Sequence, residues 1–231
     1  MSRPTLRRRA VVELGTLGSA TTLFLALFPA RPLCADMALA LLALGLVWLS
    51  ARETRQRFWG PVKESWTVRS FRSSGLVLAL GLPVALAFGG YAVMGLDQRS
   101  AEAVLSRLFG AGFWGTIAVF VPWALVQQAL FQFYLLGRLR ALLPQTAPLI
   151  PVVLTGLAYG AVHLPDRELA VLTAAAGIVW SYAYQRDRVL LLIALAHALL
   201  GTTYFTWLRG TRALAGLAAA AVGAYAEVIG Q

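Results

Sequence analysis

Apolar residues fall along this chain in stretches of about 20 residues, with arginine, proline and glycine gathered in the short segments between them. A mainly apolar stretch of that length can cross the hydrocarbon core of a bilayer as an α-helix. The pattern predicts an all-α fold, a polytopic membrane bundle of about eight transmembrane helices. The predicted spans lie near residues 11–30, 33–50, 74–94, 113–136, 147–164, 169–184, 189–208 and 213–229.

The segments between the spans are short, apart from residues 51–73 and 95–112. They leave no room for a soluble domain, so residues 1–231 are predicted to form a single membrane domain. Residues 51–73 hold six basic side chains together with Trp59 and Trp66. We expect this segment either to lie on the cytoplasmic headgroups or to be a plain loop that stops translocation.

The composition agrees with a membrane protein. Hydrophobic residues make up 59% of the chain and charged residues 13%, whereas soluble domains are about 45–50% apolar and about 25% charged. The mean hydropathy of +0.70 excludes intrinsic disorder, which requires low hydrophobicity. The single cysteine, Cys34, excludes an internal disulfide and a cysteine-rich metal site.

The net charge is +10, with 19 arginines and one lysine. If the N-terminus is inside, the inner segments hold fourteen basic residues and the outer segments six, as the positive-inside rule requires. We therefore expect a multi-pass protein of the bacterial cytoplasmic (inner) membrane with both termini in the cytoplasm. Its expected partners include membrane lipids, and nucleic acid is not among them.

The first 35 residues allow a second interpretation. Three arginines, an apolar run and the segment from Ala30 to Ala35 resemble a signal peptide. Leu33 stands directly before Cys34, where a lipoprotein signal has a small residue. Cleavage would leave the orientation of the remaining spans unchanged.

Polar side chains inside spans are functional candidates, because they are costly in hydrocarbon unless they are paired or line a cavity. Gln127, Gln128 and Gln132 lie on the fourth span. Gln128 and Gln132 are four residues apart and share a helix face. Pro122, just upstream, removes a backbone hydrogen bond and is expected to kink this helix.

The fifth span carries Tyr159 and His163, again four residues apart. Gly156 and Gly160 form a pair of small residues that lets a neighbouring helix approach closely.

The seventh span carries His197 and Gly201. Spans four and five form a hairpin that turns at residues 144–147, which predicts Gln128 and His163 at the same depth. His197 is predicted about 10 Å below His163 at 1.5 Å per residue. The alternative is that these side chains only hold helices together through hydrogen bonds.

The order of these residues resembles the CPBP family (CAAX protease and bacteriocin-processing, also called Abi) of glutamic intramembrane endopeptidases. In that family an eight-span bundle carries Glu-Glu-x-x-x-Arg on span four, Phe-x-x-x-His on span five and His-x-x-x-Asn on span seven. Gln127, Gln128 and Gln132 stand at the positions of the two glutamates and the arginine.

Tyr159 and His163 are similar to the second motif, with tyrosine in place of phenylalanine. His197 and Gly201 are similar to the third, with glycine in place of asparagine. The resemblance covers a core at about residues 113–205.

The resemblance implies that a glutamate and the histidines would activate a water and that the asparagine would help to form an oxyanion hole. The glutamine amides cannot accept a proton, as a general base must. The chain has no asparagine, and loss of one oxyanion donor costs about 10²–10³ in rate. Glu13 and Glu227 lie in the first and last spans, and nothing in the sequence brings either to His163.

No metal or other cofactor is expected, because two histidines without a close carboxylate or thiolate fall short of the usual three protein ligands of zinc. Substitution of glutamate by glutamine is also the usual way to inactivate such an enzyme deliberately. The additional changes at Gln132 and Gly201 favour natural divergence.

The sequence thus favours a catalytically impaired homologue of these proteases, which binds a transmembrane or lipidated protein segment as an accessory or regulator. The first alternative is an active intramembrane endopeptidase, for CAAX-type or C-terminal-anchor processing, that uses His163 or His197 as its base. The second is a small transporter or scaffold, although no clear internal repeat of the kind found in many transporters is visible.

Overall fold

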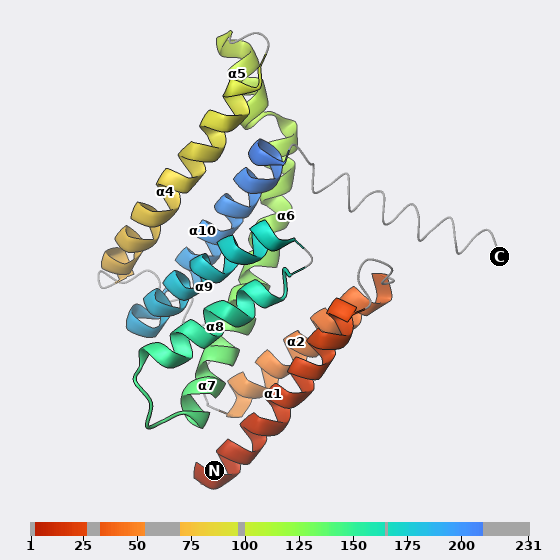
Figure 1. The fold of residues 1–231 in the computed structure, drawn as a ribbon, viewed down its shortest axis with the longest axis vertical. Coiled ribbons are helices and arrows are strands. Elements are labelled where there is room, and N and C mark those ends of the chain that lie inside the picture. The colour runs from red at the N-terminus through yellow and green to blue at the C-terminus, as the bar shows by residue number, and fades with distance from the viewer. Residues whose placement is uncertain (1–2, 27–32, 54–69, 97–99, 165, 210–231) are drawn as a thin grey trace, which may run out of the picture. The chain divides into compact units, whose positions relative to one another are not determined.

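The structure is a computed structural model, and it describes residues 3–26, 33–53, 70–96, 100–164 and 166–209. All of its regular elements in these ranges are helical (Figure 1). In chain order they are α1 (Arg3–Ala26), α2 (Leu33–Glu53), α4 (Ser70–Met94), α5 (Ala101–Phe109), α6 (Ala111–Gln128), η1 (Ala129–Leu135), α7 (Leu136–Leu142), α8 (Leu149–Ala161), α9 (Arg167–Asp187), α10 (Leu190–Thr203) and η2 (Tyr204–Leu208).

The chain divides into two compact units. Unit 1 comprises residues 1–74 and 126–193, and unit 2 comprises residues 75–125 and 194–231. Each unit is described by itself below.

Unit 1 is built around a tightly packed pair of helices, α8 and α9, which lie side by side in Figure 1. A Cβ atom at Gly156 would lie 2.6 Å from the backbone nitrogen of Ile178, and one at Gly160 would lie 2.6 Å from the carbonyl oxygen of Ala170. The close approach predicted for the two glycines is confirmed, and the helix that approaches them is α9. Helix α1 packs on α2 and α7, and α2 packs on η1.

Unit 2 contains α5, η2 and parts of α4, α6 and α10. Its hydrophobic cluster joins Ala92, Phe113 and Trp207. The rings of Phe113 and Trp207 are stacked with centroids 5.6 Å apart. The ring of Phe88 on α4 also meets that of Tyr204 on η2 at 5.8 Å. These contacts hold the C-terminal end of the seventh predicted span against its neighbours.

Each of the first seven predicted spans falls on a helix or on a continuous helical run, so the all-α prediction is confirmed over the described residues. The fourth span corresponds to α6, η1 and α7 together. Two helical stretches, Ala101–Leu142 and Leu190–Leu208, are long and apolar enough to cross a membrane. The eighth span, near 213–229, lies outside the described residues, as do the signal-like cleavage segment near residue 30 and most of residues 51–73.

Two local features go beyond the sequence prediction. Residues 95–112, predicted only as a longer connection, contain the short helix α5, which Ser100 caps by accepting a hydrogen bond from the Ala103 amide at 3.2 Å. Helix α6 continues through Pro122, and the departure from α-helical geometry begins only at Ala129. A proline removes one backbone hydrogen bond, and here that loss does not end the helix; the kink at Pro122 stays a prediction.

Many large apolar side chains on these helices are exposed. Val12 on α1 is 67% exposed, Leu86 on α4 is 65% exposed and Val171 on α9 is 71% exposed. Soluble monomers rarely expose apolar surface on this scale. Such faces suit contact with lipid chains.

Candidate functional site

The three glutamines lie where α6 changes into a π-helical segment. Gln127 and Gln128 end α6, and Gln132 lies inside η1. Gln128 and Gln132 are both fully buried. A π-helical turn is rare and is found frequently at functional sites. A second such segment, η2, follows directly after α10, the helix that carries His197 and Gly201.

Tyr159 on α8 connects this region to its neighbours in unit 1. Its hydroxyl donates a hydrogen bond of 3.5 Å to the side-chain oxygen of Gln127. Its ring meets that of Phe131 edge-on, with centroids 4.6 Å apart, and that of Trp180 on α9 at 5.7 Å. Tyr159 is fully buried, so the aromatic contacts fix the position of the hydroxyl group beside Gln127.

His163 lies just after the C-terminal end of α8 and is half-buried. Its Nδ1 lies 2.9 Å from the carbonyl oxygen of Tyr159 and 3.4 Å from the hydroxyl of Thr173. A carbonyl can only accept, so Nδ1 carries the proton in this arrangement. The Nε2 atom of the neutral ring is then the proton acceptor.

The sequence predicted Gln128 level with His163. The contact that the structure records runs instead from Gln127 to Tyr159, one helical turn before His163. The predicted level of Gln128 and His163 stays a prediction.

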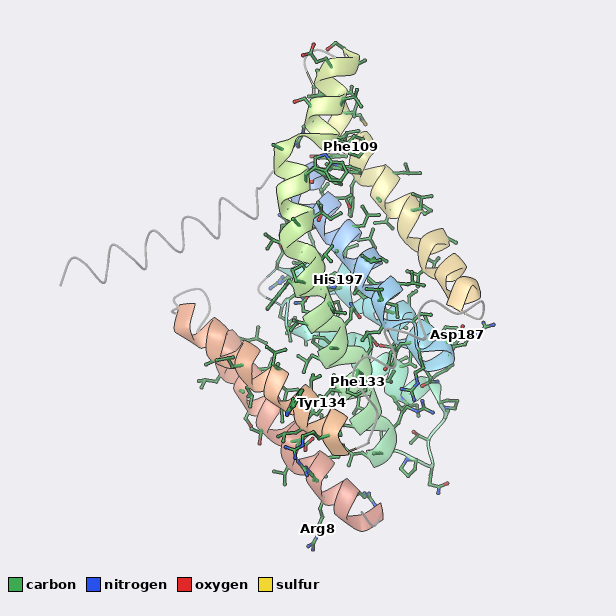
Figure 2. The ribbon with its side chains drawn as sticks, turned by 180° about the vertical axis from the view of Figure 1, so that it is seen from behind. Arg8, Phe109, Phe133, Tyr134, Asp187 and His197 are labelled. Carbon is green, nitrogen blue, oxygen red and sulfur yellow. The ribbon has the colours of Figure 1, made fainter. Side chains whose placement is uncertain are left out.

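His197 and Gly201 belong to unit 2, where His197 is buried, and their predicted depth relative to His163 also stays a prediction. Figure 2 shows His197 on α10. A Cβ atom at Gly201 would lie 2.7 and 2.8 Å from two ring carbons of Phe120 on α6. The Phe120 ring thus occupies the space that any side chain at position 201 would need.

Unit 1 also holds buried polar atoms for which the described residues provide no hydrogen-bond partner. They include both side-chain polar atoms of Gln132, the hydroxyl of Ser181 and the side-chain oxygen of Gln185. Ser181 and Gln185 lie one turn apart on α9, and α9 packs against η1. A buried polar group without a partner is costly, so these side chains are able to take a polar ligand group or water.

The carboxylate of Glu13 lies in a different place, beside Arg138 and Tyr134. It accepts hydrogen bonds from Nε of Arg138 at 2.8 Å, from the hydroxyl of Tyr134 at 2.9 Å and from Arg9 at 2.7 Å. Tyr134, labelled in Figure 2, lies in η1 two residues after Gln132. A carboxylate with three donors of this kind is engaged as an ion-pair partner and is not a candidate for the missing base.

No group of three or more metal-ligating side chains occurs among the residues that the structure describes. The sequence singled out neither Phe120 nor Ser181. Phe120 is one of many apolar residues in an apolar span, so no sequence signal marks its contact with Gly201. Ser181 lies four residues before Gln185 on α9, and this spacing of polar residues could have drawn attention to both.

The comparison with protein families gives one match. The family described as type II CAAX prenyl endopeptidase Rce1-like matches residues 104–203. This segment contains every motif position from Gln127 to Gly201, and the match confirms the resemblance to the CPBP family over that region. Searches of curated proteins and of solved structures found no match.

Proposed function

We propose that this chain, whose residues 104–203 match the Rce1-like family of type II CAAX prenyl endopeptidases, is a catalytically impaired homologue that binds a protein segment without cutting it. The bound segment is a transmembrane or lipidated part of another protein. By binding it, the chain acts as an accessory or regulator.

The contact between Gly201 and Phe120 carries this proposal. The resemblance places an oxyanion donor at position 201, and here a ring carbon of Phe120 lies 2.7 Å from the point that a Cβ atom of such a donor would occupy. Loss of one such donor costs about 10²–10³ in rate. Gln127 and Gln128 stand at the positions of the acidic pair and cannot accept a proton. Donor and base are therefore both lost, and the packing has adjusted to the loss.

The polar atoms of Gln132 and Ser181 support a binding role. A glutamine amide has both a donor and an acceptor, and neither is used by Gln132 among the described residues. A peptide group also carries one N–H donor and one C=O acceptor. A bound segment with an exposed backbone peptide group can therefore form hydrogen bonds with both polar atoms of Gln132.

The membrane arrangement is part of the proposal. The exposed apolar side chains and the two stretches that can span a bilayer support a polytopic protein. We propose eight spans in the bacterial inner membrane with both termini in the cytoplasm. Within unit 1, Glu13 in the first half of α1 bonds Arg138, close to the end of the helical run that finishes with α7. The start of α1 and the end of α7 are then on the same side, as this topology requires.

A cleavage assay tests the proposal. The purified chain in vesicles is incubated with a farnesylated CAAX peptide and with a single-span anchor peptide, and the products are identified by mass spectrometry. We expect both peptides to stay intact. Specific cleavage that is abolished in His163→Ala and retained in the control variant Arg140→Gln, an exposed side chain on α7, would contradict the proposal.

One observation favours a second candidate function, an active endopeptidase with a histidine base. The bond from Nδ1 of His163 to the Tyr159 carbonyl leaves Nε2 as the proton acceptor. For this candidate we expect a slow cleavage whose pH–rate profile follows the titration of one histidine. A rate that does not change between His163→Ala and the unsubstituted chain would contradict it.

A further inference from the structure

Helix α5 is the start of a helical stretch too long for one membrane crossing. The stretch Ala101–Leu142 has 42 residues, a helical path of about 63 Å at 1.5 Å per residue, about twice the thickness of the hydrocarbon core. The chain bends at Gly110, whose ψ of 175° is extended. A Cβ atom there would lie 2.5 Å from the carbonyl oxygen of Ser106. A glycine at this position therefore permits the bend that separates α5 from α6.

Two hydrogen-bonding side chains fix α5 to the end of η2. The guanidinium of Arg107 donates to the carbonyl oxygens of Thr206 at 2.9 Å and Trp207 at 3.1 Å. The indole N–H of Trp207 donates to the carbonyl of Leu108 at 2.8 Å. The last carbonyls of a helix lack partners within it, and a basic side chain satisfies them well. The charge of Arg107 is thus used inside unit 2.

The helix that ends at this clamp has the length of one membrane crossing. The stretch Leu190–Leu208 has 19 residues, close to the about 20 that a bilayer requires. If this stretch crosses the membrane, its end at η2 lies at a membrane surface. Helix α5, bonded to that end, lies at the same level.

The exposed side of α5 carries two large apolar side chains beside the polar Glu102 and Ser106. No residue of α5 is buried. Leu105 is 60% exposed and Phe109 is 43% exposed, and their spacing of four residues places them on one face. Figure 2 shows Phe109 at this end of unit 2. Two more exposed aromatic residues stand on the helices that precede and follow α5 in the sequence. They are Tyr91, near the end of α4, and Trp114, near the start of α6.

We infer that α5 is an interfacial anchor helix, which lies in the headgroup region of the bilayer and holds the end of η2 at the membrane surface. A short helix whose exposed side combines apolar and polar residues, with aromatic neighbours, is stabilised at that level, where the apolar side chains can enter the bilayer and the polar ones reach water. The partner of this surface is the lipid bilayer, since the apolar stretch Leu190–Leu208 ends at α5. The inference rests on one part of the proposed function, namely that unit 2 crosses a membrane. It does not depend on whether the chain cleaves a peptide.

Spin labels measure the depth of α5 directly. Single cysteines replace Leu105, Leu86 and Glu102 in a Cys34→Ala background, and each carries a nitroxide in vesicles of phosphatidylethanolamine and phosphatidylglycerol. Collisions with oxygen and with a water-soluble nickel chelate then report depth. We expect the label at 86 in the hydrocarbon, the label at 102 in water and the label at 105 between them, at the headgroups.

Each other outcome overturns the inference in a recognisable way. A label at 105 as accessible to nickel as the one at 102 places this face in water. A label at 105 as deep as the one at 86 makes α5 part of a span. If the label at 86 is itself accessible to nickel, unit 2 is not in a membrane, and the membrane part of the proposed function fails with it.

The clamp has its own test in the same vesicles. Arg107→Gln removes both bonds to the carbonyls of η2. We therefore expect the nitroxide at position 105 to become more mobile, which narrows the lines of its spectrum. Arg209→Gln is the control at a neighbouring arginine, whose Nε donates to the hydroxyl of Tyr204 at 2.9 Å. An unchanged spectrum in Arg107→Gln would show that Arg107 does not hold α5.

Discussion

The ring of Phe120 fills the space beside Gly201 that a side chain at position 201 would occupy. Two ring carbons of Phe120 lie within 2.8 Å of the position that a Cβ atom at residue 201 would take, and the Phe120 ring meets that of Phe205 at 5.6 Å. A single change from asparagine to glycine would leave a void, whereas here an aromatic ring fills the space.

We expect Gly201→Asn to lower the free energy of unfolding by about 1–3 kcal/mol, because the new side chain overpacks this contact. In a Phe120→Ala background the same substitution should cost clearly less. Thermal unfolding in detergent of the two single variants and the double variant measures this coupling. Gly90→Asn is the control, since a Cβ atom at Gly90 meets nothing within 4 Å. Additive effects of Gly201→Asn and Phe120→Ala would contradict the contact.

At the scale of elements, unit 1 depends on the close packing of α8 on α9. A Cβ atom at Gly156 would meet the backbone of Ile178, and one at Gly160 would meet the backbone of Ala170. Backbone atoms cannot give way as a flexible side chain can. The position of Tyr159 and His163 therefore depends on two glycines that have no chemical function of their own.

We predict that Gly156→Ala destabilises unit 1 by about 1–3 kcal/mol through overpacking. Gly137→Ala on α7 is the matched control, because nothing lies within 4 Å of a Cβ atom there. That control should be neutral or stabilising by up to about 1 kcal/mol, the helix propensity gained on replacing glycine. Denaturant unfolding followed by circular dichroism compares the two, and equal effects would refute the packing argument.

A second element-scale feature is the ion pair that joins α1 to α7. Glu13 and Arg138 are 8% and 5% exposed and bond at 2.8 Å, and the Arg138 guanidinium also lies 5.5 Å from the Tyr134 ring centre. Removal of one partner leaves the other charge buried without compensation. Arg138 is one of the fourteen basic residues predicted in the inner segments, and the structure buries it.

We expect Glu13→Gln to cost about 3–5 kcal/mol of stability, the typical effect of breaking a buried pair. Glu102→Gln, at an exposed glutamate in the first turn of α5, should cost less than about 1 kcal/mol. Limited proteolysis at increasing temperature follows the release of α1 in each variant. If α1 stays as protected in Glu13→Gln as in the control, the ion pair does not hold it.

At the scale of the whole molecule, the apolar periodicity predicted the helices well. The helix predicted at 189–208 is observed as the helical stretch Leu190–Leu208, and the turn predicted at residues 144–147 lies between α7 and α8. Both follow from the length of apolar runs and from proline positions, which are local properties. The family resemblance also came from local spacing, and the family match confirms it over residues 104–203.

The rest depends on contacts between distant residues. The π-helical segment with Gln132 has the same apolar pattern as an ordinary helix, so nothing in the sequence distinguishes it. The bonds from Arg107 to Thr206 and Trp207 join positions about a hundred residues apart. The Phe120 ring beside Gly201 likewise involves two residues on different helices.

A photo-crosslinking amino acid at position 128, in the native membrane, tests most directly whether the site binds without cutting. The captured partner is identified by mass spectrometry, and its termini are compared with those of the same protein outside the complex. The same crosslinker at Val171, which is 71% exposed, gives the background of lipid-facing contacts. We predict an intact transmembrane or lipidated protein that is captured at 128 and absent at 171. A captured partner with a new terminus near the crosslink would contradict the proposal, because the site would then still cut.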